Sequence, residues 1–496
     1  MISNMSSIRE GSDECSISPL EWYDVPPTQT AVVEAYDVEF LPTSAIRQGG
    51  AVEFYIPASA EDYLDVKNSR LYIRARIVKA DGTQTAADEA VAPVNNLLQS
   101  MWSNVELLAN ERLIAHTNNI HGYVSIISHL LHDSDEVLTS ERQMQMIYKD
   151  TASQLDVTNP ALPNPLHLIP GYSYRWVTTA VLEPNPNAAT RNTQPQILNV
   201  QEENQLTAAD VDLGNHGLYQ RYVATRASRP FEMLGNIRMD LFEQLRYLPN
   251  GMSLKIRLHP QKTAFTLMCP APQGGAAQQQ YKIEILNATY IARRVKVSPG
   301  VLLGHADALQ QRPAEFPLLR KECKSFAIPQ GLQQFKQDNI FLGQLPKRVV
   351  LAMVTEKAFS GHHQQNPFNF ELFNASLVQI YADGVPVRSR PFEPNADGAK
   401  VVECYNALYR ELGKVDSDRG CIVKQDDWSR GYSLFAFSLA ADADCDDHTS
   451  LIKHGNLRVE IQFRVALEEA IQLLVYAEFD NLLKIDNDRQ VLVDYV

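Results

Sequence analysis

Three histidines in the first third of the chain have a spacing that could serve a metal ion. His129 and His132 stand three residues apart, with His121 upstream and Asp133 next. Imidazoles at this spacing share one face of a helix and can bind zinc together. The stretch 123–131 also fits an ordinary amphipathic helix, because its apolar residues recur on one face. We favour this second interpretation, which puts the histidines on the solvent side.

An acidic segment later in the chain resembles a calcium-binding loop. Asp442, Asp444 and Asp446 alternate along it as the first ligands of such a loop would. The sixth position is Asp447 where the loop needs glycine, and the twelfth is Lys453 where it needs glutamate. We therefore interpret 442–447 as an exposed acidic turn.

Catalytic and cofactor signatures are not found in the sequence. His362 and His363 precede a loop composition, and no His-x-His occurs, which argues against a cupin-type metal enzyme. The segment 273–280 is Gly- and Gln-rich but lacks the phosphate-binding Lys, and no Gly-x-Ser-x-Gly occurs. The sequence thus predicts no catalytic, cofactor-binding or metal-binding residue, and no cofactor.

The six cysteines indicate reduced, intracellular chemistry rather than a disulfide framework or a zinc site. They are scattered without a Cys-x-x-Cys pair: Cys15, Cys269, Cys323, Cys404, Cys421 and Cys445. The chain begins without a signal-peptide pattern, and no apolar run approaches the length of a membrane span, so we expect no membrane insertion.

The charge balance argues against a protein that condenses nucleic acid by itself. The net charge is −14, and the first thirty residues are mostly acidic where they are charged. The densest basic cluster, Arg293, Arg294 and Lys296, lies inside a predicted strand. Binding to phosphates needs many Lys and Arg side chains on one surface, and no such patch is visible in the sequence.

The strands and turns predicted from the sequence occur twice along the chain, in the same order. Segment 248–258 is a Gly-containing turn and an alternating strand, and a long apolar strand follows at 281–291. Segments 452–463 and 471–479 repeat this order. A tandem duplication of one β-domain explains the recurrence better than chance.

A second pair lies upstream of the first. Asn104–Ile114 matches Ser376–Val387, and each is followed by a predicted short helix, at 123–131 and 401–412. We expect the two segments to be equivalent strands, and likewise Met252–Leu258 and Leu457–Phe463.

These repeats predict an all-β chain of two tandem eight-stranded β-sandwiches, a double jelly roll with short helices in its loops. We expect an N-terminal arm at 1–30, a first jelly roll at 31–298 and a second at 299–496. The first half carries a Pro- and Asn-rich insertion, 151–215, that the second lacks. Long insertions of this kind are usually functional or disordered.

The second half resembles the major capsid protein, or hexon, of Maverick/Polinton elements and adintoviruses. The matching residues include Ile340-Phe-Leu-Gly-Gln-Leu-Pro and Val475-Tyr-Ala-Glu-Phe-Asp-Asn-Leu-Leu. The other segments that carry the resemblance are 366–370, 431–437 and 451–461. The first half is similar mainly in layout, most closely at 36–42 and 104–118.

The resemblance implies a homotrimer of upright jelly rolls, a pseudo-hexameric capsomer of an icosahedral shell around double-stranded DNA. It implies trimer–trimer contacts, a penton or minor capsid partner, only indirect contact with DNA, and no active site. It also implies a protein made in the host cell, assembled in the nucleus and located in the virion capsid. An alternative is a double β-sandwich that binds or cleaves carbohydrate. That alternative needs aromatics and a carboxylate pair in one cleft, and the four tryptophans, Trp22, Trp102, Trp176 and Trp428, are dispersed.

Overall fold

The computed structural model describes most of the chain. The described residues are 22, 25, 27–47, 49–158, 214–272, 278–395, 400–416, 420–440 and 450–493, together with the backbone of three short strands between 168 and 199. Most of the arm 1–30, most of the insertion 151–215 and the acidic turn 442–447 therefore lie outside the described residues.

The first half of the chain forms two four-stranded antiparallel sheets. Their strand orders are β1-β13-β3-β10 and β2-β11-β5-β6. The strands are β1 (Val32–Phe40), β2 (Val52–Ile56), β3 (Asp62–Lys79), β5 (Trp102–Ala109), β6 (Arg112–His116), β10 (Phe231–Gly235), β11 (Leu254–Pro260) and β13 (Tyr281–Val297). Two short strands, β4 (Ala92–Pro93) and β12 (Leu267–Met268), pair separately, as do β7 (Leu168–Ile169), β8 (Tyr172–Trp176) and β9 (Ile197–Asn199).

The second half also forms two antiparallel sheets. The orders are β14-β22-β17-β20, with β23 beside β22, and β15-β21-β18-β19, with β16 beside β21. The strands are β14 (Ala314–Ile328), β15 (Gln334–Gln337), β16 (Leu342–Gln344), β17 (Arg348–Thr355), β18 (Ala375–Ala382), β19 (Val385–Pro386), β20 (Phe435–Ser438), β21 (His454–Phe463), β22 (Ile471–Ile485) and β23 (Val491–Val493).

The two halves have the same strand order. β1, β13, β3 and β10 occupy the places that β14, β22, β17 and β20 take, and β2, β11, β5 and β6 match β15, β21, β18 and β19. The predicted pairs of equivalent segments fall on β5 with β18 and on β11 with β21, so they agree with the sheet order. Four antiparallel strands facing four, twice in one chain, make a double jelly roll.

Each upstream segment proves to be a hairpin rather than one strand. Asn110 and Glu111 turn the chain between β5 and β6, and Asp383 and Gly384 turn it between β18 and β19, all four with positive φ. Two-residue turns of this kind match the twist of the flanking strands and favour Asn, Asp and Gly. The single strands predicted over these segments were wrong in this respect.

The helices lie at the ends of the sheets and between them. They are α1 (Leu97–Ser100), α2 (His121–His132), α3 (Asp135–Thr139), the 3-10 helix η2 (Glu141–Gln145), α4 (His216–Thr225), α5 (Asp240–Glu243), α6 (Thr263–Thr266), α7 (Pro299–Gln311), α8 (Glu356–Ser360), α9 (Val402–Glu411) and α10 (Gln425–Trp428). The segment that connects the two halves forms α7, with Pro299 in its first turn.

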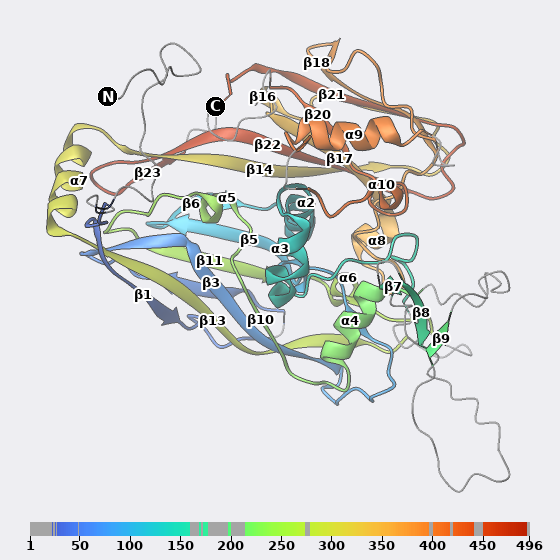
Figure 1. Cartoon of the computed structure of the whole chain (residues 1–496), viewed down its shortest axis with the longest axis horizontal. Coiled ribbons are helices and arrows are strands. Elements are labelled where there is room, and N and C mark those ends of the chain that lie inside the picture. Colours follow the sequence, from blue (N-terminus) through green and yellow to red (C-terminus); the bar gives the residue numbers. More distant parts are fainter. Residues whose placement is uncertain are drawn as a thin grey trace, which may run out of the picture.

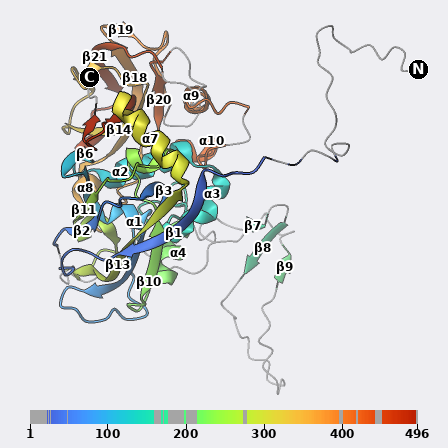
Figure 2. The same ribbon diagram turned by 90° about the vertical axis from the view of Figure 1, so that its left-hand side faces the viewer.

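The long strands of both halves run along the longest axis of the molecule (Figure 1). Helix α7, in yellow, joins the halves at one end, while α4, α6, α8 and α10 lie toward the other. Figure 2 looks onto the α7 end and shows the two halves stacked one above the other.

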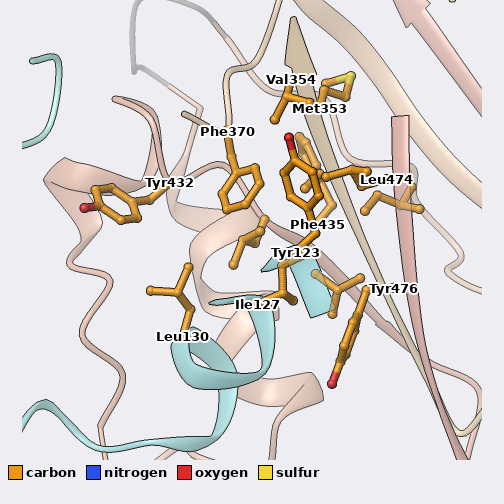
Figure 3. Close-up of a cluster of buried hydrophobic side chains, with 14 of the residues drawn as sticks. Tyr123, Ile127, Leu130, Met353, Val354, Phe370, Tyr432, Phe435, Leu474 and Tyr476 are labelled. Carbon is orange, nitrogen blue, oxygen red and sulfur yellow. The ribbon is translucent and has the colours of Figure 1, made fainter. Parts of the chain in front are cut away.

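Each half has its own hydrophobic core, and helix α2 joins them. The first core lies between β3 and β13 on one side and β5 and β11 on the other. The second core includes residues of α2, which belongs to the first half of the chain. Figure 3 shows Tyr123 and Ile127 of α2 beside Leu474 and Tyr476 of β22. Burial of this apolar helix face against a sheet of the other half holds the two jelly rolls together.

Candidate functional site: the junction of the two halves

The histidines of α2 lie in the interior. His121 and His129 have no exposed surface, and His132 is partly buried. The helix was predicted within two residues of its bounds, but the interpretation that its histidines face solvent is wrong. Gln99 and Arg238 of the first half, and Glu478 and Lys321 of the second, surround the polar side of α2. That side therefore packs against polar and charged groups instead of water.

His132 reaches across the junction to a buried carboxylate. Its Nε2 donates a hydrogen bond to Oε1 of Glu478 in β22, at 2.5 Å. Arg348 of β17 donates from Nη1 to the other carboxylate oxygen at 2.7 Å, and Tyr476 donates to Oε1 at 2.9 Å. Glu478 has no exposed surface, so its charge depends entirely on these partners.

A second carboxylate at the C-terminal end of α2 binds three partners. Asp133 accepts from Nδ1 of His129 at 2.7 Å, from Arg142 at 2.8 Å and from Arg238 at 3.1 Å. Arg238 also pairs with Glu243 of α5 at 3.2 Å. The cluster therefore fixes α2, η2 and the loop before α5 relative to one another.

Lys321 of β14 links the second half of the chain to α2 and α5 of the first. Its Nζ is paired with Glu243 and donates to the hydroxyl of Ser128 in α2 at 2.8 Å. Its backbone N–H donates to Asp240 at 3.1 Å. We call the side chains of His129, His132, Asp133, Arg238, Glu243, Lys321, Arg348 and Glu478 the junction network. It links α2, α5 and the loop before α5 in the first half to β14, β17 and β22 of the second.

The junction network sets the pKa values of its members. Burial would raise the pKa of Glu478, but His132 and Arg348 hold it well below its usual value. Burial would likewise raise that of Glu243, but Arg238 and Lys321 lower its pKa to about 2. Burial, together with the Arg238 charge, lowers the pKa of His129 to about 4.

Two titratable groups near the network, His121 and Asp240, have pKa values shifted towards their uncharged forms. Burial lowers the pKa of His121 to about 3, and its Nε2 donates to Gln99 at 3.0 Å. Burial raises the pKa of Asp240 to about 7, although Lys321 opposes the shift. Because its buried carboxylates are paired with cations and hydrogen-bond donors inside the protein, the network is suited to holding the halves in one fixed orientation.

One sequence signal could have revealed the network. Glu478 stands at the end of the apolar run that begins at Ile471, in a strand with both faces buried. A carboxylate in such a strand requires a charged or hydrogen-bonding partner. The sequence does not identify that partner, because His132 lies far upstream in the other half.

The other predicted sites have structural partners or lie outside the described residues. His363 is buried, and its Nδ1 donates to the carbonyl of Leu267 at 2.9 Å. The turn 442–447, the residues 273–277, Cys15 and Cys445 are outside the described part. Cys269, Cys323, Cys404 and Cys421 are free, buried thiols. Among the described residues, no group of three or more His, Cys, Asp or Glu side chains is arranged to hold a metal ion.

One hollow bears on the carbohydrate alternative. It has a volume of about 740 Å³ and contains Asp156 and Glu371. The amide nitrogen of Asn369 donates to both carboxylates at 2.6 Å, and burial raises the pKa of each. Of the dispersed tryptophans, Trp102 and Trp428 are buried in the cores. Phe373 is the aromatic residue among those lining the hollow. Carboxylates are thus present, but a stacking platform of the expected kind is not seen among the described residues.

No helix within the described ranges is long and apolar enough to cross a membrane.

Comparison with known proteins shows the fold. No family model matches the chain. An uncharacterized protein of Caenorhabditis elegans is 21% identical over 492 residues, which cover 95% of this chain and all of that protein. A chain of the cryo-EM structure of the Sputnik virophage aligns with a TM-score of 0.62 and 12% identity, covering 99% of this chain and 94% of that one.

Two further solved structures share the architecture. The Faustovirus major capsid protein aligns with a TM-score of 0.53 and 9% identity, over 94% of this chain and 92% of that one. A chain of the PBCV-1 virus capsid aligns with a TM-score of 0.51 and 9% identity, over 96% and 99%. The protein thus has the double jelly-roll fold found in viral capsids.

Proposed function

We propose that this chain is a major capsid protein of the Maverick/Polinton and adintovirus type. The observation that carries the proposal is the repetition of one jelly roll, twice in the same strand order, with the junction network fixing the two copies side by side. Similar solved structures come from viral capsids, and the sequence segments named above resemble the same family.

The repetition has a geometric consequence for assembly. A chain with two similar domains supplies two of six corners, so three chains close a pseudo-hexagonal ring. Such homotrimers would tile an icosahedral shell around double-stranded DNA. A penton or minor capsid protein would fill the remaining positions, and the virion capsid would be the protein's location. The jelly rolls would span about 31–298 and 299–496, and the role would be structural rather than catalytic.

The experiment that tests the proposal is size-exclusion chromatography with light scattering, followed by negative-stain microscopy across a series of salt concentrations. We expect trimers, and shells or sheets of trimers at higher ionic strength, because screening within about 10 Å at 0.1 M weakens repulsion between acidic capsomers. A protein that stays monomeric at every concentration and salt would overturn the proposal and favour carbohydrate binding, which a glycan array would then test.

The insertion 151–215 is assigned to the outer face of the capsomer or to the contact between chains. Its Pro- and Asn-rich composition suits a segment ordered by neighbouring copies better than one with a core of its own. Leu155 is buried in the second core and Asn215 caps α4, so the deletion is confined to 159–213. This deletion should leave the thermal unfolding of the jelly rolls intact and weaken the trimer. A deletion that unfolds the whole chain would contradict this assignment.

A further inference from the structure

The equivalent hairpin turns of the two halves differ in what covers them. In the first half, Arg112 donates from Nη1 to the carbonyl of Val491 at 2.7 Å. Asn110 donates from Nδ2 to the carbonyl of Arg489, also at 2.7 Å. The end of the second half thus covers the β5–β6 turn. At the matching position of the β18–β19 turn, Val385 is 65% exposed.

The equivalent sheets show the opposite difference. From Arg348 to Val354 in β17, every residue is buried. Helices α2 and α5 of the first half pack against β14 of that sheet, and α9 of the second half packs against β20. In β3, which holds the same place in its sheet, buried residues alternate with Tyr72, Arg74 and Arg76. Among the described residues, the outer face of β1-β13-β3-β10 around these side chains is therefore left uncovered.

The helices that follow the hairpins repeat the pattern. All residues of α2 except His132 are buried, because α2 lies between α1 and β5 of the first half and β14 of the second. In α9, Val402, Asn406 and Arg410 are exposed. They lie four residues apart and therefore form a single stripe on the helix. Helix α9 thus has an open face where α2 has a covered one.

We infer that the uncovered surfaces meet between two copies of this chain. The first half presents α2 and the β5–β6 turn to the second, and the second receives them on the β14-β22-β17-β20 sheet and β23. The second half would present α9 and the β18–β19 turn in the same way. The next copy would receive them on its β1-β13-β3-β10 sheet. This inference rests on the proposed trimer, and it names the surface on which that trimer closes.

The chemistry of the receiving sheet fits a partner with mixed charge. Its outer face carries the pairs Arg74–Glu232, at 3.8 Å, and Arg293–Asp37, at 3.3 Å, with side chains between 38% and 61% exposed. The α9 surface offers Glu403 and Arg410. The covered sheet in the second half likewise meets α2 through His132–Glu478 and α5 through Glu243–Lys321, so a charged contact has a precedent within the chain.

The strand registers place one specific residue pair at the new contact. Val385 holds the place of Arg112, because each follows its two-residue turn. Val491 pairs with Ile485, which in turn pairs with Ala314.

In the first half, Val297 of β13 is equivalent to Ile485 of β22. Val297 pairs with Val32, the first residue of β1, and Ile485 pairs with Ala314, the first residue of β14. The next pair along β13 is Lys296 with Asp62 of β3. Glu61, which precedes Asp62, is therefore opposite Val297 and equivalent to Val491, which is opposite Ile485. Val385 of one copy should therefore lie beside Glu61 of the next.

The test is the double variant E61C/V385C, treated with a short bismaleimide cross-linker and run on a denaturing gel. We expect covalent dimers and trimers from the double variant. We expect only monomers from E61C, V385C and the wild type, which control for the native cysteines. Trimers in light scattering without cross-linking of the double variant would overturn this inference and leave the proposed function standing. A wild-type chain that never forms trimers would overturn the proposed function itself.

A second pair of variants does not depend on cysteine chemistry. Arg410 in α9 and Lys357 in α8 are both exposed helical cations, at 61% and 64%. R410E should raise the concentration at which trimers dissociate by about tenfold, as charge reversal at an interface does. K357E should leave that concentration unchanged. Equal effects of the two variants would contradict the assigned surface.

Discussion

Asn110 and Asp383 make the same pair of hydrogen bonds in the two halves of the chain. Asn110 donates its N–H to the carbonyl of Ser253 at 3.0 Å and accepts from the Ser253 N–H through Oδ1 at 2.9 Å. Asp383 does the same with Asn456, at 2.9 and 2.8 Å. Each residue opens a hairpin turn with positive φ, so one local structure is built twice from different side chains.

This equivalence predicts the effect of substitutions at Asp383. D383N should change the free energy of unfolding little, because Asn tolerates the left-handed conformation and keeps the Oδ1 acceptor, as Asn110 does. D383A should cost about 1–2 kcal/mol, since it removes the acceptor and strains the turn. Urea unfolding at one fixed protein concentration measures both. An alanine variant as stable as D383N would show that the side-chain bond contributes nothing.

The junction network should be far more sensitive to truncation than a surface ion pair. E478A leaves Arg348 and His132 buried without their carboxylate, so we expect a loss of about 3–5 kcal/mol or an insoluble chain. K357A, which breaks the exposed Lys357–Glu469 pair at 3.5 Å, should cost less than about 1 kcal/mol. Thermal unfolding followed by circular dichroism compares them, and similar losses would contradict the account of the junction.

The buried histidines should make the fold sensitive to acid. The pKa values of His121 and His129 are lowered from 6.5 to about 3 and about 4 in the folded protein. Their contribution to stability is therefore complete above about pH 6.5 and is lost as the pH falls towards those lowered values, because only the unfolded chain binds the protons.

The expected slope is about 1.4 kcal/mol per pH unit for each histidine in this window. H129N keeps a donor towards Asp133 and removes one proton-binding group, so its stability should fall less steeply between pH 6.5 and 4. Urea midpoints at several pH values give the slopes. Parallel slopes for the variant and the wild type would show that His129 does not titrate in this way.

How much the sequence could predict depends on how local the determinants are. The alternation in β3 and the Gly-containing turn before β11 depend on neighbouring residues, so strands and their repetition were predictable. The Asn110–Glu111 and Asp383–Gly384 turns had a local signal, which the prediction of single strands overlooked.

The junction could not be predicted because its contacts join distant segments. A helical period shows which side of α2 is apolar, but not that Glu478 and Lys321 cover its polar side. His129 in a surface helix and His129 in a buried ion network have the same sequence around them. The cost of burying such groups is met only by partners that the fold brings together.

Two glycines in helices provide the last prediction, which tests packing where the insertion rejoins the first half. A Cβ at Gly217 in α4 would lie 2.6 Å from the carbonyl oxygen of Lys149 and 2.7 Å from that of Tyr148. Both are backbone atoms, and the Tyr148 carbonyl accepts hydrogen bonds from Arg221 and Asn95, so they cannot move aside cheaply. G217A should therefore destabilise the protein by about 1–3 kcal/mol despite the helix propensity of alanine.

Gly304 in α7 is the matched control. Nothing lies within 4 Å of a Cβ built there, so G304A should stabilise the protein by up to about 1 kcal/mol through helix propensity alone. Both variants make the same chemical change in a helix, so the difference between their unfolding midpoints isolates the clash at Gly217. If the two variants shift the midpoint in the same direction by the same amount, the close approach of α4 to residues 148–150 is not present in solution.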